Sequence, residues 1–256
     1  MTKVTIVVPV HNCPDLLLNC HEGLGKTRHP IHIVYVDNGS DAQTRDMLHR
    51  LDNCQVVYNT TNEGFSKAVN IGAKASKSSV IILYNQDCMN PNPCWVDNIL
   101  ELFKQRRACA VQGALLTYPN TRIIQHAGIV YPPGTSGMHS YENTSSDRAE
   151  VQESKQYAAV TGAVMAVRRE VWDALGGFSE DYALDCEDSD FCLRVQKELH
   201  LQVWYNARVH VEHATGAVKK RTPTALEMMR ASHDTFMARW DNYLRELPSA
   251  YTTFLR

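Results

Sequence analysis

Four carboxylates lie within six positions of the chain, in the segment Asp185-Cys186-Glu187-Asp188-Ser189-Asp190. The apolar residues that follow have the spacing of a helix, at Phe191, Cys192, Val195 and Leu199. With about 3.6 residues per turn, these residues surround the direction of Asp188, whereas Asp190 points about 200° away from it. We therefore expect Asp188 to face the apolar side of the helix. Asp190 is expected to face solvent or to pair with Arg194 at i,i+4 spacing.

The inward-facing carboxylate of Asp188 has two interpretations. A carboxylate directed at a core is costly unless it is paired, capped or used in chemistry. The functional interpretation makes Asp188 a catalytic group. The structural one makes it the N-cap of the helix, where an Asp side chain satisfies free backbone N–H groups. The residue pattern alone leaves both open.

The first half of the chain alternates between β-rich runs and helical patterns. Strands are expected at residues 4–8, 31–36, 55–58 and 80–84, with a fifth beginning at residue 109. Helices are expected at residues 16–24, 44–51, 65–75 and 93–106. Strands that alternate with helices of this length indicate right-handed βαβ units and a mainly parallel, doubly wound α/β sheet.

Polar residues follow three of these strands. They are Asp37-Asn38-Gly39-Ser40, then Asn59 with Asn62-Glu63-Gly64, and finally Asn85-Gln86-Asp87. Ligands bind beyond the carboxyl ends of the strands in such sheets, so the three sets together favour a ligand crevice. Any single set is also explained by turn chemistry, because Asp, Asn and Gly dominate turns for backbone reasons.

The second half of the chain has a different pattern. A long loop is expected at residues 132–154, followed by a strand at 157–167 with Gly162 inside it, and a short helix at 168–175. A late strand at 202–211 runs into His213, and an amphipathic helix at 225–247 closes the chain. We expect one domain over residues 1–256, with parts at 1–115, 116–222 and 223–256.

The composition narrows the function classes. A net charge of −2 gives no support for nucleic-acid binding. No run approaches the roughly 20 apolar residues of a transmembrane helix, and the short N-terminal apolar run lacks a signal-peptide layout. The eight cysteines form no C-x-x-C pair, so reduced thiols are expected instead of a disulfide framework or a zinc ribbon. These features predict a cytoplasmic protein.

Several strings, taken in order, resemble the family 2 glycosyltransferases with the GT-A fold. In the first half they are Val7-Val8-Pro9-Val10-His11-Asn12, Val36-Asp37-Asn38-Gly39-Ser40 and residues 62–72. In the second half they are residues 160–169, Gly176-Gly177-Phe178 and residues 188–194. The string Ile124-Gln125-His126-Ala127-Gly128 is also similar to members associated with bacterial surface polysaccharides, including rhamnosyltransferase-like enzymes.

The resemblance implies a GT-A, Rossmann-like sheet with a C-terminal acceptor-side segment. It also implies inverting transfer of a sugar from a nucleotide diphosphate donor to an acceptor hydroxyl. Asp87 matches the last residue of the family's metal-binding Asp-x-Asp, and Asn85 replaces the first carboxylate. His213 resembles a histidine placed near the metal or the diphosphate, with a surface histidine as the alternative. The implied cofactor is Mn²⁺ or Mg²⁺, with a requirement that Asn85 puts in doubt.

The remaining candidate residues follow from the same resemblance. The donor would contact Pro9, Asp37, Asn62, Gly64, Asn70, Asn85 and Gln86. Asp37 would read the nucleobase. Asp188 matches the catalytic base, and Glu187 and Asp185 are alternatives that could bind acceptor hydroxyls instead. Lys67 is expected to be an exposed helix lysine, with a phosphate contact as the alternative.

Three further histidines and a basic cluster are weaker candidates for functional residues. His210 should face the opposite side of its strand from His213. His126 and His139 are candidates for acceptor or phosphate contacts, with structural roles as the alternative. Lys219-Lys220-Arg221 is interpreted as a solvated turn, the alternative being a contact with donor phosphates or with a lipid-linked acceptor at the inner face of an anionic membrane.

The implied partners are a nucleotide diphosphate sugar and a glycan, lipid-linked or protein-linked acceptor. Two other functions remain in competition with transfer. One is a sugar-phosphate nucleotidyltransferase, disfavoured because no Gly-rich basic loop follows the first strand. The other is a silent nucleotide-sugar-binding module, which Asn85 favours.

Overall fold

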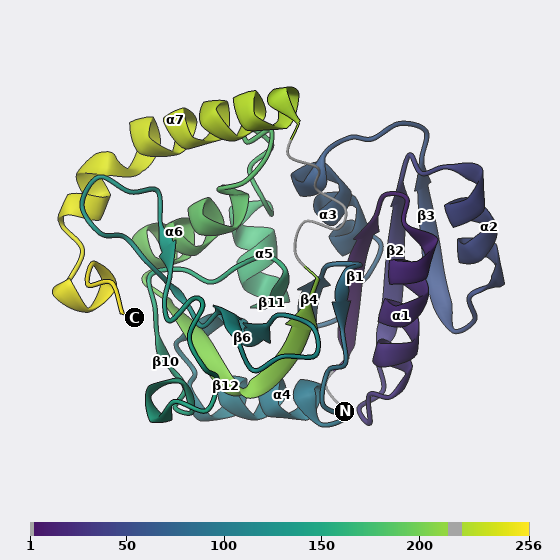
Figure 1. The fold of residues 1–256 in the computed structure, drawn as a ribbon, viewed down its shortest axis with the longest axis horizontal. Coiled ribbons are helices and arrows are strands. Elements are labelled where there is room, and N and C mark those ends of the chain that lie inside the picture. Colours follow the sequence, from purple (N-terminus) through teal and green to yellow (C-terminus); the bar gives the residue numbers. More distant parts are fainter. Residues whose placement is uncertain (1–2, 215–221, 256) are drawn as a thin grey trace.

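A mixed ten-stranded sheet forms the centre of the molecule (Figure 1). The computed structural model describes residues 3–214 and 222–255. Along the sheet the main strands follow the order β10-β12-β6-β11-β4-β1-β2-β3. Their bounds are β1 Val4–Val10, β2 His32–Asn38, β3 Cys54–Asn59, β4 Val80–Tyr84, β6 Cys109–Thr117, β10 Lys155–Gln156, β11 Val164–Arg168 and β12 Gln202–His213.

Most neighbouring long strands are parallel. β1, β2, β3 and β4 pair in parallel, and so do β6 and β12. β11 is antiparallel to both β4 and β6, which it separates. Two short strands lie off this path: β5 (Cys88–Met89) pairs with β12, and β7 (Ile124–His126) pairs with β6. The mainly parallel α/β sheet expected from the sequence is confirmed.

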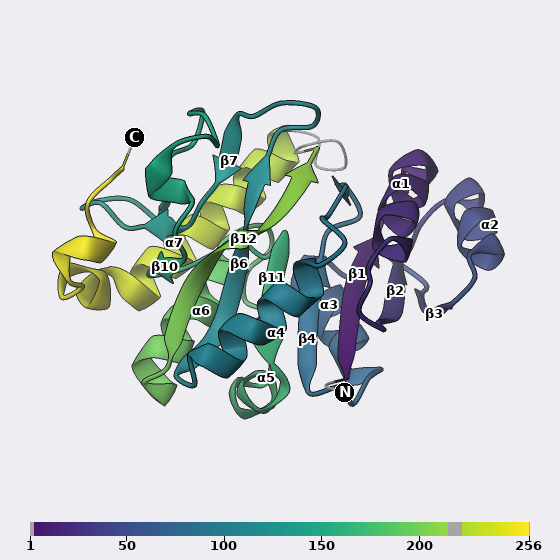
Figure 2. The same ribbon diagram turned by 90° about the horizontal axis from the view of Figure 1, so that it is seen from below.

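Helices cover both faces of the sheet (Figure 2). One face packs against α1 (Pro14–Gly25), α2 (Ala42–Arg50) and α4 (Trp95–Gln105). The other packs against α3 (Phe65–Lys74), α5 (Arg169–Leu175), α6 (Glu187–Leu199) and the long α7 (Pro223–Arg245). Each expected helix is present with ends shifted by a few residues at most.

The buried β1 strand shows why the sheet needs both layers. Ile6 and Val8 belong to the core on the α1 side, whereas Val7 belongs to the core on the α3 side. Successive side chains of a strand point to opposite faces, so an apolar run with no polar alternation must be covered twice. This covering leaves only the strand ends open for a site.

The expected strand at residues 157–167 is wrong in its first half. The ladder begins at Val164, and the preceding residues are irregular. Ala159 forms only an isolated bridge with Ile129 of β8, and the Thr161 and Gly162 N–H groups donate to the side chains of His126 and Asp188. The expected loop at 132–154 contains a short strand β9 (Met138–His139), paired with β8 (Ile129–Val130), and the 3₁₀ turn Ala149–Val151.

Two further observations bear on the composition. All eight cysteines are free thiols. Within residues 3–214 and 222–255, no helix has both the length and the apolar character that crossing a membrane requires.

Candidate active site

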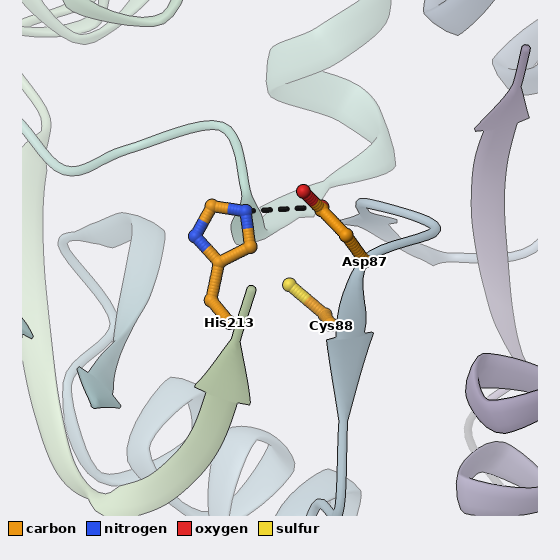
Figure 3. Close-up of side chains that lie close together, drawn as sticks. All are labelled: Asp87, Cys88 and His213. Atoms are coloured by element: carbon orange, nitrogen blue, oxygen red, sulfur yellow. Dashed lines mark hydrogen bonds and ion pairs between the residues drawn. The ribbon is translucent and has the colours of Figure 1, made fainter. Parts of the chain in front are cut away.

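The turn after β4 and the end of β12 bring Asp87, Cys88 and His213 together (Figure 3). β5 begins at Cys88, which pairs with His213 across the antiparallel ladder, so the two side chains project from adjacent backbones. Nε2 of His213 lies 3.0 Å from Oδ1 of Asp87. Both residues are more than nine-tenths buried. Asp87 and His213 are 126 residues apart in the sequence, so it is the strand pairing that brings them together.

The residues at this point fit a hard divalent cation. Oδ1 of Asp87 and Nε2 of His213 lie within hydrogen-bonding distance of each other, so both atoms could contact a single ion placed beside them. Oδ1 of Asn85 is buried and has no hydrogen-bond partner in the described part of the chain, so a neutral oxygen is also left over in this turn. Asp87 and His213 can thus supply two ligands, with the others left to water and phosphate.

Cys88 does not suit such a cation. Burial raises the pKa of its thiol well above the ordinary value, and the thiol lies within hydrogen-bonding distance of the Ala163 carbonyl, Sγ to O, at 3.5 Å. A neutral thiol is a poor ligand for Mg²⁺ or Mn²⁺, which prefer oxygen. We therefore assign Cys88 to the packing beneath the site.

Asp188 lies in the first turn of α6 and is partly buried. Its Oδ2 accepts the Gly162 N–H at 2.8 Å, and its Oδ1 accepts the Ser189 N–H at 2.6 Å. Burial raises the pKa of this carboxyl, although the two N–H groups act against the rise. The N-cap of α6 is Cys186, so Asp188 does not occupy the N-cap position, although its side chain does accept one free N–H of the first turn, that of Ser189.

One short segment connects Asp188 with the Asp87 turn. We name residues 161–163 the bridge segment. On one side its Gly162 N–H holds Asp188. On the other side the Ala163 carbonyl accepts the backbone N–H of Asn85 at 2.9 Å and also lies beside the Cys88 thiol. The candidate base and the candidate cation site are therefore fixed by the same few backbone atoms.

The environment of Asp190 differs from one of the two alternatives expected for it. It has no exposed surface, so the prediction that it faces solvent is wrong, whereas the predicted pair with Arg194 is present at 2.8 Å. Arg239 donates to Asp190 at 2.9 Å, and so do the Tyr182 hydroxyl and the Trp240 indole N–H. α7 supplies Arg239 and Trp240 and covers the side of α6 that was expected to be open.

Asp37 is fully buried at the end of β2. Its Oδ2 accepts a hydrogen bond from Nε of Arg45 at 2.8 Å, and its Oδ1 accepts the Ser40 N–H at 2.9 Å. Each oxygen thus already has one protein partner. The nucleobase-reading role of Asp37 stays a prediction, and Arg45, with 40% of its side chain exposed, is the part of this pair that reaches the surface.

Gln86 ties two of the expected strand ends together. Its Oε1 accepts the His11 N–H at 2.6 Å, and its Nε2 donates to the Asn12 carbonyl at 2.8 Å. The loop after β1 is thereby fixed to the turn after β4. Pro9, the other residue expected at this wall of the site, lies in β1 beside Val36 of β2.

Asn62 and Gly64 form an exposed turn before α3. The Asn62 Oδ1 accepts hydrogen bonds from the Asn38 side chain at 2.9 Å and from the Gly64 N–H at 3.0 Å. Gly64 has a φ of 85° and leaves open space where a side chain would be. Lys67 is exposed and pairs with Glu63, as the helix interpretation predicts.

Asn70 does not reach an open site. Its Nδ2 donates to the Phe178 carbonyl and to Glu180, and its Oδ1 accepts the Phe178 N–H, each at 3.0 Å. The adjacent Gly177 has no room for a Cβ, which would lie 2.4 Å from that same Oδ1. The predicted donor contact of Asn70 is untested, and its visible role is to hold the turn before α6.

The other sequence candidates, Glu187, His210 and His126, differ in burial and in contacts. Glu187 is buried at the start of α6. His210 is exposed and bonds Thr117 at 2.9 Å, on the opposite face of β12 from buried His213, as expected. His126 is buried beside His139, with Nδ1 atoms 3.3 Å apart. The basic cluster at residues 219–221 lies outside the described residues.

Two residues near the site were missed. Cys88 follows Asp87 directly, but its approach to His213 depends on the β5–β12 pairing of a two-residue strand. Gln125 lies within the surface-polysaccharide string and bonds His213 at 2.6 Å. Position inside that string was the one available signal for Gln125.

Comparison with known proteins gives one family model that matches most of the chain. Residues 5–176 match the model of glycosyl transferase family 2. An uncharacterized protein of Sinorhizobium fredii is 27% identical over 94% of this chain, which spans only 28% of that relative's length. The O-antigen chain rhamnosyltransferase of Salmonella anatum is 24% identical over 84% of this chain and 67% of its own length.

Solved structures share the fold. A mannosyltransferase of Pyrobaculum calidifontis, in complex with GDP-mannose and Mn²⁺, has a TM-score of 0.69 at 16% identity. The match covers 98% of this chain and 67% of the mannosyltransferase. At this identity the likeness establishes the GT-A architecture.

Proposed function

The chain belongs to glycosyl transferase family 2, and from this premise we propose that it moves a sugar, with inversion, from a nucleoside diphosphate sugar to an acceptor hydroxyl. The observation that carries the proposal is the bridge segment, which holds a carboxylate of raised pKa on one side and the turn of a cation site on the other. The rhamnosyltransferase relative supports surface polysaccharide assembly as the setting. The acceptor is then a glycan or a lipid- or protein-linked saccharide.

Asp188 acts as the base in this proposal. Its carboxylate takes the proton of the acceptor hydroxyl while that oxygen attacks the anomeric carbon, and the nucleoside diphosphate leaves from the opposite face. The raised pKa makes the carboxylate a stronger base than an ordinary Asp. The N–H groups of Gly162 and Ser189 fix its orientation, which reduces the entropy lost in reaching the reactive geometry.

Asp87 and His213 would hold a divalent cation, Mn²⁺ or Mg²⁺, which neutralises charge on the departing diphosphate. The Mn²⁺ in the mannosyltransferase structure supports the choice of metal. Asn85 adds a neutral oxygen where the family motif has a carboxylate, so the protein contributes less negative charge to the ion. We expect cation binding to depend strongly on the donor phosphates.

The donor would lie across the ends of β1, β2 and β4. Pro9, Asp37, Asn62, Gly64 and Gln86 border this edge. Hydrogen bonds of Asp37, Asn62 and Gln86 to neighbouring loop residues give it a fixed shape before ligand arrives. We place the reaction in the cytoplasm, with peripheral contact to the inner face of the membrane where the acceptor is lipid-linked. A silent nucleotide-sugar-binding module is the second candidate, favoured by Asn85.

The test uses a panel of UDP-, dTDP- and GDP-sugars with Mn²⁺, Mg²⁺ or EDTA. Binding is measured by calorimetry, and transfer by nucleotide release with saccharide acceptors. Asp188→Asn should keep donor binding and lose about 10²- to 10⁴-fold in transfer rate. Asp234→Asn is the matched control, because the Asp234 side chain is 85% exposed on α7.

The outcomes separate the candidates. Full transfer by Asp188→Asn would remove Asp188 as the base. Donor binding without transfer to any acceptor would favour the silent module. No binding of any nucleotide sugar would contradict both.

A further inference from the structure

Gln125 occupies an irregular position in the sheet. β7 runs antiparallel to β6, and the paired residues are Leu116 with His126 and Thr117 with Ile124. One step along β6 thus corresponds to two steps along β7, so Gln125 is the extra residue of a β-bulge. Bulges leave one residue outside the ladder and redirect its side chain. Here the redirected side chain is 6% exposed.

The bulge directs Gln125 at the imidazole of His213. The Gln125 Oε1 lies 2.6 Å from Nδ1 of His213, and the other ring nitrogen, Nε2, lies 3.0 Å from Oδ1 of Asp87. The ring is therefore held between an amide and a carboxylate. Nε2 of Gln125 has no hydrogen-bond partner in the described chain, so no contact there competes with His213 for the orientation of the amide.

We propose that Gln125 is a positioning residue, which fixes the tautomer of His213 so that its Nε2 lone pair is directed at the cation site. A neutral imidazole carries one hydrogen, and an acceptor at Nδ1 keeps that hydrogen on Nδ1. Metal-binding histidines usually donate their other N–H to such an acceptor, which orients the ring and raises its basicity. A neutral amide does this without adding negative charge to a buried site.

In the opposite tautomer, both candidate ligand atoms would be occupied by a hydrogen bond to each other. With the hydrogen on Nε2, His213 would donate to Asp87, and neither atom could bind an ion without losing that hydrogen bond. The acceptor that the bulge places at Nδ1 favours the tautomer with its hydrogen on Nδ1 over this one. The inference rests on the proposed cation site, and its test must separate failure of Gln125 from failure of that site.

The first measurement is binding of Mn²⁺ alone to the whole chain, by calorimetry or by electron paramagnetic resonance. Gln125→Met keeps the length of the side chain and removes the acceptor, and we expect it to bind Mn²⁺ about 10- to 100-fold more weakly. Gln125→Glu restores an acceptor and should bind at least as tightly as wild type. Gln105→Met is the matched control, because Gln105 is exposed on α4 and bonds only Glu101.

The second measurement reads the tautomer directly. In a long-range ¹H–¹⁵N spectrum of protein labelled at histidine, with His213→Ala to assign the signals, neutral His213 should carry its hydrogen on Nδ1. Gln125→Met should move hydrogen toward Nε2. A change in packing alone would alter melting temperature without transferring the hydrogen, so the spectrum separates positioning from a structural role.

The possible results are distinct. If wild type binds no Mn²⁺, either alone or with UDP or GDP present, the cation site fails and the inference fails with it. If wild type binds Mn²⁺ and Gln125→Met binds it equally well, the cation site stands and Gln125 is not its positioning residue. If Gln125→Met does not fold, the wild-type spectrum decides, because a hydrogen on Nε2 of neutral His213 would overturn the proposal.

Discussion

Replacing Asp190 by Asn should destabilise the protein more than any other single Asp-to-Asn change in the acidic segment. The carboxylate is fully buried and is shared by Arg194 of α6 and Arg239 of α7. Tyr182 and Trp240 also donate to it. An amide oxygen in its place can keep those two neutral hydrogen bonds, so the change removes mainly the charge that the two guanidinium groups share.

The expected loss in free energy of unfolding follows from how deeply Arg194 and Arg239 are buried. Removing one partner of a buried ion pair costs about 3–5 kcal/mol, because it leaves an uncompensated charge. Arg194 has 13% of its side chain exposed and also donates to the carbonyls of Leu175 and Gly177, whereas Arg239 is 38% exposed and keeps Asp181. These remaining contacts and the exposure of Arg239 place the loss at the lower end, about 3 kcal/mol. For a chain of this size that is a fall of about 6–12 °C in melting temperature.

The assay is thermal unfolding and urea denaturation of Asp190→Asn beside the exposed control Asp234→Asn. Surface changes of the control type usually stay within about 0.5 kcal/mol. A double-mutant cycle with Arg239→Met should show a coupling of about 1–3 kcal/mol, because the two side chains are in direct contact. Equal stability losses for Asp190→Asn and Asp234→Asn would refute the argument that α7 is fastened to α6 through this carboxylate.

Four further predictions concern the site and the turn before α6. A base must be ionised, and burial raises the pKa of Asp188. The transfer rate should therefore fall as pH is lowered through that raised pKa, at a higher pH than for an ordinary Asp. A transfer rate that stays unchanged until the usual Asp range is reached would contradict this. Because the folded state disfavours ionised Asp188, wild type loses stability as pH rises from the ordinary Asp pKa to the raised one. In thermal scans across pH, Asp188→Asn should therefore melt higher than wild type above the raised pKa and equally only below the ordinary Asp range. Asn85→Asp should tighten Mn²⁺ binding measured by calorimetry and lower the melting temperature without metal, because it adds a second carboxylate to the turn of Asp87; unchanged affinity would place Asn85 outside the cation site. Gly177→Ala should destabilise the protein by about 1–3 kcal/mol in urea denaturation, since φ is +84° and its Cβ would overlap the Asn70 amide; a neutral effect would be contrary to that geometry.

The sequence predicted the sheet because its signal is local and repeated. Each strand is an apolar run and each helix has its own periodicity, so the alternation could be detected without knowing what packs on what. Placement of Asp87 and Asp37 at strand ends followed from the same pattern. Helical phase likewise directed Asp188 inward.

The same reasoning failed where a distant element decides the environment. The phase of α6 alone predicts solvent or a pair with Arg194 for Asp190; the pair is present, but α7, about 50 residues later, covers the side expected to be open. The irregular segment before Val164 looked like a strand because its side chains are apolar, while its N–H groups bind His126 and Asp188. Gln125 faces His213 through a bulge, which changes pairing register without a marked change in residue type.

The bridge segment has a consequence for how such a protein can diversify. Peptide N–H and C=O groups are present whatever side chain is encoded, so the atoms that contact Asp188 and the Asn85–Cys88 turn do not depend on the side chains of the bridge segment. Gly162 is the exception, because a Cβ there would lie 3.3 Å from that of Asp188. Under the proposed function, surrounding loops can therefore accumulate substitutions that alter donor or acceptor preference while Asp188 and the Asp87 turn keep their separation. Substrate preference and the proposed catalytic geometry can therefore vary independently in this fold.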